Sequence, residues 1–200
     1  MTVLTQAAAA FQANTSRPSA ELVVRALLQA EKATKQERVS YPFESLWGHW
    51  RLCFATGTRK ARRGGIVLGK GFYVPQFAVA QISFGGVTGS HDESGKGTIG
   101  NQVEVGPVRL RFTGPARYRG QKNLLAFDFT QLQIGVLGKT VYDGGVRGGT
   151  RKTEAFDSQS IARLPFFAFF IVTPDFIAAR GRGGGLAIWV KQALSTDDSR

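Results

Sequence analysis

Side chains capable of acid–base or nucleophilic chemistry are few in this chain of 200 residues. Its two histidines are His49, which precedes Trp50, and His91, which lies in a stretch rich in Gly and Ser. His91 is followed by Asp92 and Glu93, but adjacent residues rarely converge on one ion, so the stretch is typical of a solvated loop. A Ser-His-Asp arrangement stays open, although the Gly-x-Ser-x-Gly elbow is absent. We therefore predict no metal site, no catalytic residues and no enzymatic activity.

Two further polar groups lie within apolar runs. Cys53 is the only cysteine, which excludes a disulfide framework, and its apolar neighbours are typical of a buried thiol. Asp128 lies between Phe127 and Phe129. It is the candidate for the buried acid that an enzyme acting on a lipid or tetrapyrrole inside a barrel would need. The alternation of a β-strand favours a solvent-facing Asp128 instead.

Positive charge is distributed unevenly along the chain, whose formal net charge is +12. No Asp or Glu occurs between residues 45 and 91, and this stretch holds the basic cluster Arg59, Lys60, Arg62 and Arg63. Each cation near an anionic membrane contributes on the order of 1 kcal/mol. Because no helix-turn-helix, zinc-finger or RNP1-like motif accompanies the cluster, we expect an anionic membrane surface as partner and not nucleic acid. A basic solvated face without a specific partner is the open alternative.

One amphipathic helix is predicted over residues 19–38. Ser19 is a suitable N-cap, and Glu21 lies in the first turn, where a negative charge suits the helix dipole. Apolar residues then recur at helical spacing, and we expect this stripe to pack on the domain that follows. Residues 1–18 are predicted to be a flexible arm and residues 193–200 a frayed tail.

Short alternating segments dominate residues 45–192 and predict a mainly β, antiparallel barrel or sandwich. Val108, Leu110 and Phe112 alternate with polar residues, so one face is buried and the other basic and wet. Leu125, Phe127 and Phe129 have one parity and Leu132 and Ile134 the other, which predicts a break near Thr130. Gly-rich turn clusters separate some eight or nine strands. A hydrophobic content of 42% is ample for a packed core.

Several segments together resemble one known family. Gly48-His49-Trp50, at the start of the first strand, resembles the Gly-x-Trp signature of the lipocalins. More of the chain, roughly residues 20–192, looks like the plastid lipid-associated proteins, or fibrillins. The segments similar to that family are Leu46–Thr56, Gln81-Ile82, Gly100–Val103, Asp175–Gly181 and Leu186–Lys191.

This resemblance implies a lipocalin-like antiparallel β-barrel with an N-terminal amphipathic helix. It implies binding of a small hydrophobic molecule (a carotenoid, a quinone or an acyl lipid) at thylakoid or lipid-globule surfaces, with no other cofactor. The N-terminus resembles neither a secretory signal nor a transit peptide, and no run reaches the roughly 18 apolar residues of a membrane span. The resemblance then implies a cyanobacterial-type member, peripheral on the cytoplasmic side of the thylakoid membrane.

Inward-facing aromatic side chains are the candidate ligand contacts of such a barrel. We assign this role to Trp50, Phe54, Phe84, Phe112, Phe127 and Phe129. A barrel of about eight strands encloses one small apolar ligand, although plain core packing is the alternative for each Phe. The lipocalin resemblance implies that Trp50 plugs the barrel floor with a cation, such as Arg180, across its ring.

Four phenylalanines within residues 166–170 cannot all face one side of a strand. Either both faces of this strand are covered, one of them by the amphipathic helix, or one face meets lipid or a protein partner. The alternative function is therefore a scaffold or assembly factor for a photosynthetic complex or a prenyl-quinone enzyme, with Phe166–Phe170 as the contact.

Overall fold

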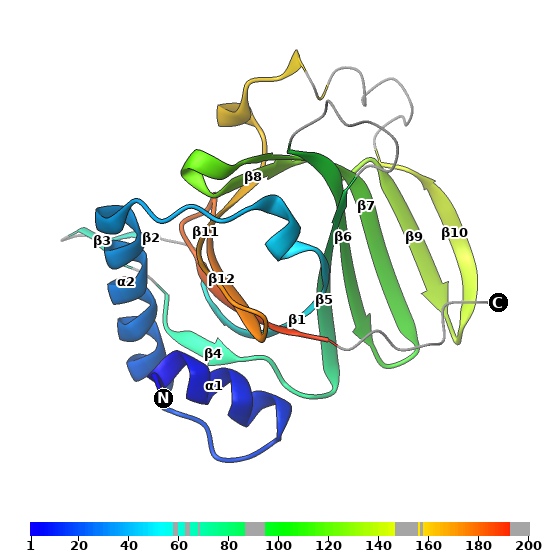
Figure 1. Ribbon diagram of the computed structural model, residues 1–200. Coiled ribbons are helices and arrows are strands. Elements are labelled where there is room, and N and C mark those ends of the chain that lie inside the picture. Colours follow the sequence, from blue (N-terminus) through cyan, green and yellow to red (C-terminus); the bar gives the residue numbers. More distant parts are fainter. Residues whose placement is uncertain are drawn as a thin grey trace.

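The computed structural model describes residues 1–57, 60–62, 65–67, 69–86, 95–146, 156 and 158–192. Within these residues the chain forms a closed antiparallel β-barrel, two helices on its outer side and an extension of the sheet beyond the barrel (Figure 1). This confirms the mainly β, lipocalin-like architecture predicted from the sequence.

Helix α2 (Ala20–Glu37) forms where the sequence predicts it. The Ser19 hydroxyl accepts a hydrogen bond from the backbone N–H of Leu22, and Arg38 ends the helix in the left-handed conformation. Neither α2 nor the helix before it in the described chain has the length and apolarity that crossing a membrane requires.

The prediction of a flexible arm over residues 1–18 is wrong, because helix α1 (Val3–Gln12) occupies it. Thr2 caps the helix by accepting a hydrogen bond from the Thr5 N–H. The side chains of Leu4, Ala7, Ala8, Ala10 and Phe11 are buried. Four of them have the i, i+3, i+4, i+7 spacing of one helical face, so the alanines act as packing residues and not as linker.

Eight strands close the barrel in the order β7-β6-β5-β1-β13-β12-β11-β8, with β8 pairing back onto β7. They are β1 (Gly48–Thr56), β5 (Ala78–Gly86), β6 (Lys96–Val105), β7 (Val108–Arg119), β8 (Leu124–Phe127), β11 (Phe166–Val172), β12 (Phe176–Gly181) and β13 (Leu186–Lys191). Closure leaves these strands without a free edge and fills the interior with alternate side chains.

The remaining elements lie at the ends of the barrel or beside it. They are η1 (Phe43–Leu46), β2 (Lys60–Arg62), β3 (Gly65–Val67), β4 (Gly71–Tyr73), η2 (Gly120–Lys122), β9 (Gln131–Val136), β10 (Lys139–Gly145) and η4 (Ile161–Arg163). The short helix η1 enters one end of the barrel (Figure 1), where Phe43 and Leu46 are buried in the interior cluster.

Strands β9 and β10 extend the sheet beyond the barrel, a feature that the sequence analysis did not predict. The first half of β7 pairs with β9 and its second half with β8. Residues 128–130 separate β8 from β9, so the predicted strand break is confirmed. Gly114 makes room for this break, because a Cβ there would lie 1.9 Å from the carbonyl oxygen of Asp128.

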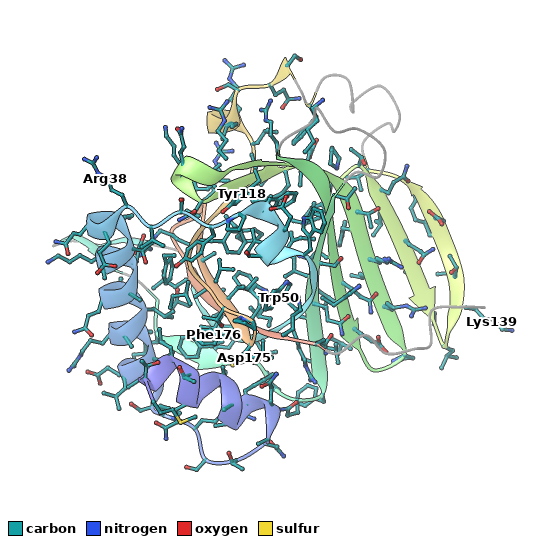
Figure 2. All side chains as sticks on the ribbon, viewed as in Figure 1. Arg38, Trp50, Tyr118, Lys139, Asp175 and Phe176 are labelled. Atoms are coloured by element: carbon teal, nitrogen blue, oxygen red, sulfur yellow. The ribbon has the colours of Figure 1, made fainter. Side chains whose placement is uncertain are left out.

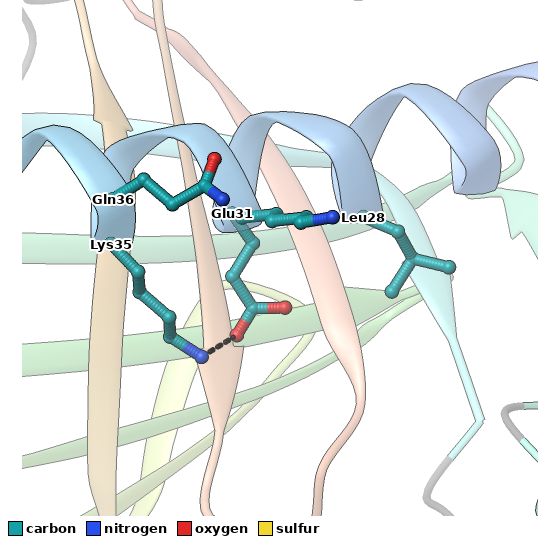
Figure 3. A pocket seen from close by; sticks show the side chains of 5 residues that line it. Leu28, Glu31, Lys35 and Gln36 are labelled. Carbon is teal, nitrogen blue, oxygen red and sulfur yellow. Dashed lines mark hydrogen bonds and ion pairs between the residues drawn. The ribbon is translucent and has the colours of Figure 1, made fainter.

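An ion pair fastens α2 to the barrel wall. The Arg180 guanidinium, on β12, donates from Nε to Glu31 Oε1 at 2.8 Å and from Nη2 to Glu31 Oε2. Lys35 also contacts Glu31 Oε1, at 2.9 Å, beside a shallow groove on α2 (Figure 3). Burial alone would raise the pKa of Glu31, but the hydrogen bonds from Arg180 and Lys35 lower it to about 2.

Replacement of Glu31 should therefore destabilise the fold in a pH-dependent way. The depressed pKa stabilises the native state above pH 4.5, and this contribution is lost as the pH falls towards 2. At pH 7 we expect Glu31→Gln to lower the free energy of unfolding by about 3 kcal/mol, measured by urea denaturation. The difference from the wild type should shrink at pH 3.

Glu21→Gln is the matched control, because Glu21 forms an exposed ion pair with Arg25 on the same helix. Exposed pairs of this kind are worth about 0.5 kcal/mol or less. Equal losses in the two variants at pH 7 would contradict the assigned role of Glu31.

Candidate apolar binding site

Trp50 closes one end of the barrel interior. Its side chain is fully buried, and its indole Nε1 donates to the Leu46 carbonyl of η1 at 2.7 Å. The cation across its ring is Lys191, whose Nζ lies 4.1 Å from the ring centroid. The predicted Arg180 contact is wrong, because Arg180 lies on the outer side of the wall with Glu31. Burial lowers the pKa of Lys191.

Gly48 makes this arrangement possible. Its φ of +116° lies in a region that favours glycine, and a Cβ at this position would lie 2.6 Å from Lys191 Nζ. The Gly-x-Trp spacing thus has a physical reason in this chain. Glycine leaves the space through which the Lys191 side chain reaches the ring two residues further on.

The predicted ligand-contact residues do not all share one environment. Phe84 and Phe127 are buried in the interior cluster, and Phe129 packs against it half-buried. Phe112 is half-buried on β7. The assignment of Phe54 to the interior is wrong.

The position of Phe54 follows from a bulge in β1. The register with β13 shifts between Leu52 and Phe54, so alternation restarts there on the opposite face. Phe54 belongs to the outer cluster beneath the two helices, and its ring centroid lies 5.1 Å from that of Tyr73. Cys53 is buried in the same cluster, where burial raises its pKa to about 12, as expected for an inert buried thiol.

A continuous row of aromatic rings leads from the barrel interior to the end of the barrel opposite η1, which we call its open side. Ring centroids lie 5.4 Å apart between Trp189 and Phe167, and 5.1 Å apart between Phe167 and Phe127. Phe129 follows at 5.2 Å from Phe127, and Phe112 at 5.6 Å from Phe129. Trp189 and Phe127 are buried and Phe167 between them is half-buried, and the row ends at half-buried Phe129 and Phe112.

The sheet extension continues the interior face of the barrel as an exposed apolar surface. Ile82 of the interior pairs with Asn101, Asn101 with Phe112, and Phe112 with Leu132. Directly opposite residues share a face, so neighbouring rows carry the same surface outward through Val103, Val105, Val108, Leu110, Ile134, Val136 and Tyr142. Val105 is 51% exposed and Tyr142 45%. We call this surface, together with the aromatic row, the apolar track.

The other face of the same four strands is polar. Its central row consists of Gln102, Arg111, Gln133 and Asp143, which lie opposite one another on β6, β7, β9 and β10. Gln133 Nε2 donates to Asp143 Oδ2 at 3.2 Å. Figure 2 shows Trp50 and Tyr118 within the barrel and Lys139 on the extension, far from the barrel interior.

Sequence reasoning missed most residues of the extension as parts of a site. Val108 and Leu110, and Leu132 and Ile134, are predicted from the sequence only as strand residues. One signal for them is present in the sequence. Three successive segments each place apolar residues on one parity and polar residues on the other, an alternation more regular than a strand with both faces covered requires. His49 is exposed, as expected of a residue that does not line the interior.

Other predicted sites lie outside the described residues. These are Arg59 and Arg63 of the basic cluster, the side chains of Lys60 and Arg62, the loop with His91, Asp92 and Glu93, and the tail from residue 193. Asp128 is described and is half-buried in the break between β8 and β9.

The account of Gly48 predicts the effect of a single methyl group. Gly48→Ala should lower the free energy of unfolding by about 2 kcal/mol through backbone strain and the displaced Lys191 ammonium, measured by urea denaturation. Gly138→Ala is the control, because Gly138 also has positive φ but nothing lies within 4 Å of its Cβ position. A loss no greater than that of Gly138→Ala would rule out the proposed contact.

Comparison with known proteins identifies no family for this chain. No family model matches the chain, and no curated protein matches it. The resemblance to the plastid lipid-associated proteins therefore stays a prediction from the sequence.

Proposed function

We propose that this protein is a non-enzymatic binder of elongated apolar molecules, such as a carotenoid, a quinone or an acyl lipid. The observation that supports the proposal is the continuity of the apolar track, which runs from buried Trp189 to the exposed surface at Val105. Exposed apolar surface contiguous with an interior is typical of a ligand groove.

The ligand would occupy the open side of the barrel and not a hollow running through it. The end beside η1 is occupied by Phe43, Leu46 and Trp50, all of which are buried. At the other end Phe129, Phe112 and Leu110 are only partly buried, so an apolar chain lying over them would remove their surface from water. Such burial stabilises a complex by about 25 cal/mol per Å² before the cost of association.

Paired substitutions on the two faces of the extension test this site. Leu110 lies opposite Ile134 on the apolar track, and their neighbours Arg111 and Gln133 lie opposite each other on the polar face. We expect Leu110→Ala with Ile134→Ala to weaken binding of a fluorescent polyene fatty acid about tenfold, because this removes roughly 1.4 kcal/mol of contact.

The matched control is Arg111→Ala with Gln133→Ala, which should leave the dissociation constant unchanged. Fluorescence titration measures both. Equal weakening by the two pairs, or wild-type protein that binds no polyene fatty acid, would refute the proposal.

We further propose that the basic cluster at residues 59–63 holds the protein reversibly on an anionic membrane, such as the cytoplasmic face of a thylakoid. The support is its charge, since four cations contribute roughly 4 kcal/mol at such a surface. Flotation should show binding to vesicles with anionic lipid and little binding to neutral vesicles. Replacement of all four cations by Gln should abolish the difference; identical flotation of variant and wild type would end the docking proposal.

A scaffold that binds its partner through Phe166–Phe170 is less well supported. Phe169 and Phe170 are each 3% exposed, one inside the barrel and the other beneath the helices. Only Phe166 and Phe167 keep surface that a partner could contact without local unfolding.

A further inference from the structure

A second pocket lies on the outer face of the barrel, on the other side of its wall from the aromatic row. It has a volume of about 450 Å³ and lies against β7, β8 and β11. Its lining combines three cations, Arg117, Arg119 and Lys122, with three apolar side chains, Leu124, Ile161 and Phe166. This combination of side chains is unlike that of the apolar track.

Strand alternation explains the cations. Ala116 and Tyr118 of β7 point into the barrel, so Arg117 and Arg119 between them point outward. Lys122 follows in η2, the connection from β7 to β8.

The apolar floor belongs to a small cluster of its own. Ala126, Phe156 and Leu164 are its buried members, and the three apolar lining residues pack against them partly buried. Phe166 lies opposite Ala126 in the pairing of β11 with β8, and η4 contributes Ile161. The floor therefore belongs to the barrel wall and to the segment that crosses it before β11.

One of the three cations of this pocket makes contacts with neighbouring residues, and the other two are exposed. Arg117 Nη2 donates to the Gln159 carbonyl at 2.9 Å, and its guanidinium lies 5.6 Å from the Phe156 ring centroid. Arg119 and Lys122 are exposed, and no acid is among the residues that line the pocket in the described chain. The positive charges of Arg119 and Lys122, which line the same pocket, favour the binding of an anion there.

We infer that this pocket binds an anionic amphiphile, whose phosphate or carboxylate contacts Arg119 and Lys122 and whose alkyl part lies on Leu124, Ile161 and Phe166. Both halves of the lining are needed for such a ligand. A free anion leaves the apolar floor exposed, and an uncharged lipid offers no negative charge to Arg119 and Lys122. This site is separate from the apolar track, and it stands whether or not the track binds a ligand.

Calorimetric titration of the full-length protein with monomeric short-chain ligands tests the inference. The probes are dihexanoyl phosphatidic acid, dihexanoyl phosphatidylcholine, decanoate and inorganic phosphate. We expect phosphatidic acid to bind at least tenfold more tightly than phosphatidylcholine and than inorganic phosphate. The affinity for decanoate relative to phosphatidic acid shows which of the two anionic groups Arg119 and Lys122 bind more tightly, and both ligands should bind more tightly than inorganic phosphate.

Arg119→Gln with Lys122→Gln should weaken binding of phosphatidic acid at least tenfold. Arg109→Gln with Arg111→Gln is the matched control, because these residues have the same outward parity on β7 but lie on the extension. Ile161→Ala should weaken phosphatidic acid and leave inorganic phosphate unchanged. The inference is overturned if the two charge pairs have equal effects, if inorganic phosphate binds as tightly as phosphatidic acid, or if no anionic amphiphile binds.

Discussion

The break between β8 and β9 is the constraint on which the architecture depends. Both strands run antiparallel along β7, but residues 128–130 separate them where β7 reaches Gly114. On one side of the break β8 continues to β11 and closes the barrel; on the other, β9 continues to β10 and leaves the sheet open. The break contains three residues opposite only two on β7. The residues that face the interior therefore change from odd-numbered positions before the break to even-numbered positions after it. Phe127 before it and Leu132 after it therefore keep the same face, and the barrel interior continues onto the extension.

The two helices cover the outer face of the barrel wall, whereas the apolar inner face continues onto the exposed extension. Helices α1 and α2 bury Phe54, Phe170 and Phe176 against the outer side of β1, β11 and β12, and the pair of Glu31 with Arg180 fixes α2 there. Removing one partner of such a pair is costly, because it leaves the other charge buried without its counter-ion. With this side covered and the η1 end occupied by Trp50 and Phe43, the apolar surface that stays contiguous with the interior, among the described residues, is that of the extension.

The sequence predicted what depends on local periodicity and missed what depends on a change of register. Helix α2 was predicted from the Ser19 N-cap and a regular apolar stripe. The barrel was predicted from alternating apolar and polar segments that begin at the Gly-x-Trp sequence. Phe54 was misplaced because one bulge after Leu52 moves it to the outer face, and nothing in the alternation of residues 50–54 signals the shift. Arg180 was assigned to Trp50 by resemblance, whereas the register pairs Trp50 with Lys191. The extension was missed because the pairing partners of β7 are non-local, and the alternation of a strand does not give its partners.

Strand β7 gives the two candidate sites their separation and their different chemistry. In its first half the outward side chains Arg109 and Arg111 lie on a polar face, and the inward Leu110 and Phe112 lie on the apolar track. In its second half the inward side chains are those of Ala116 and Tyr118, and the Tyr118 hydroxyl donates a hydrogen bond to the Tyr41 carbonyl. The outward side chains there, Arg117 and Arg119, lie beside the apolar floor of the outer pocket. A ligand on the track and an amphiphile in the outer pocket would thus contact opposite faces of one strand, at different ends of it. Two ligands held this way do not compete for surface, so any coupling between them would have to pass through the position of β7 at Gly114.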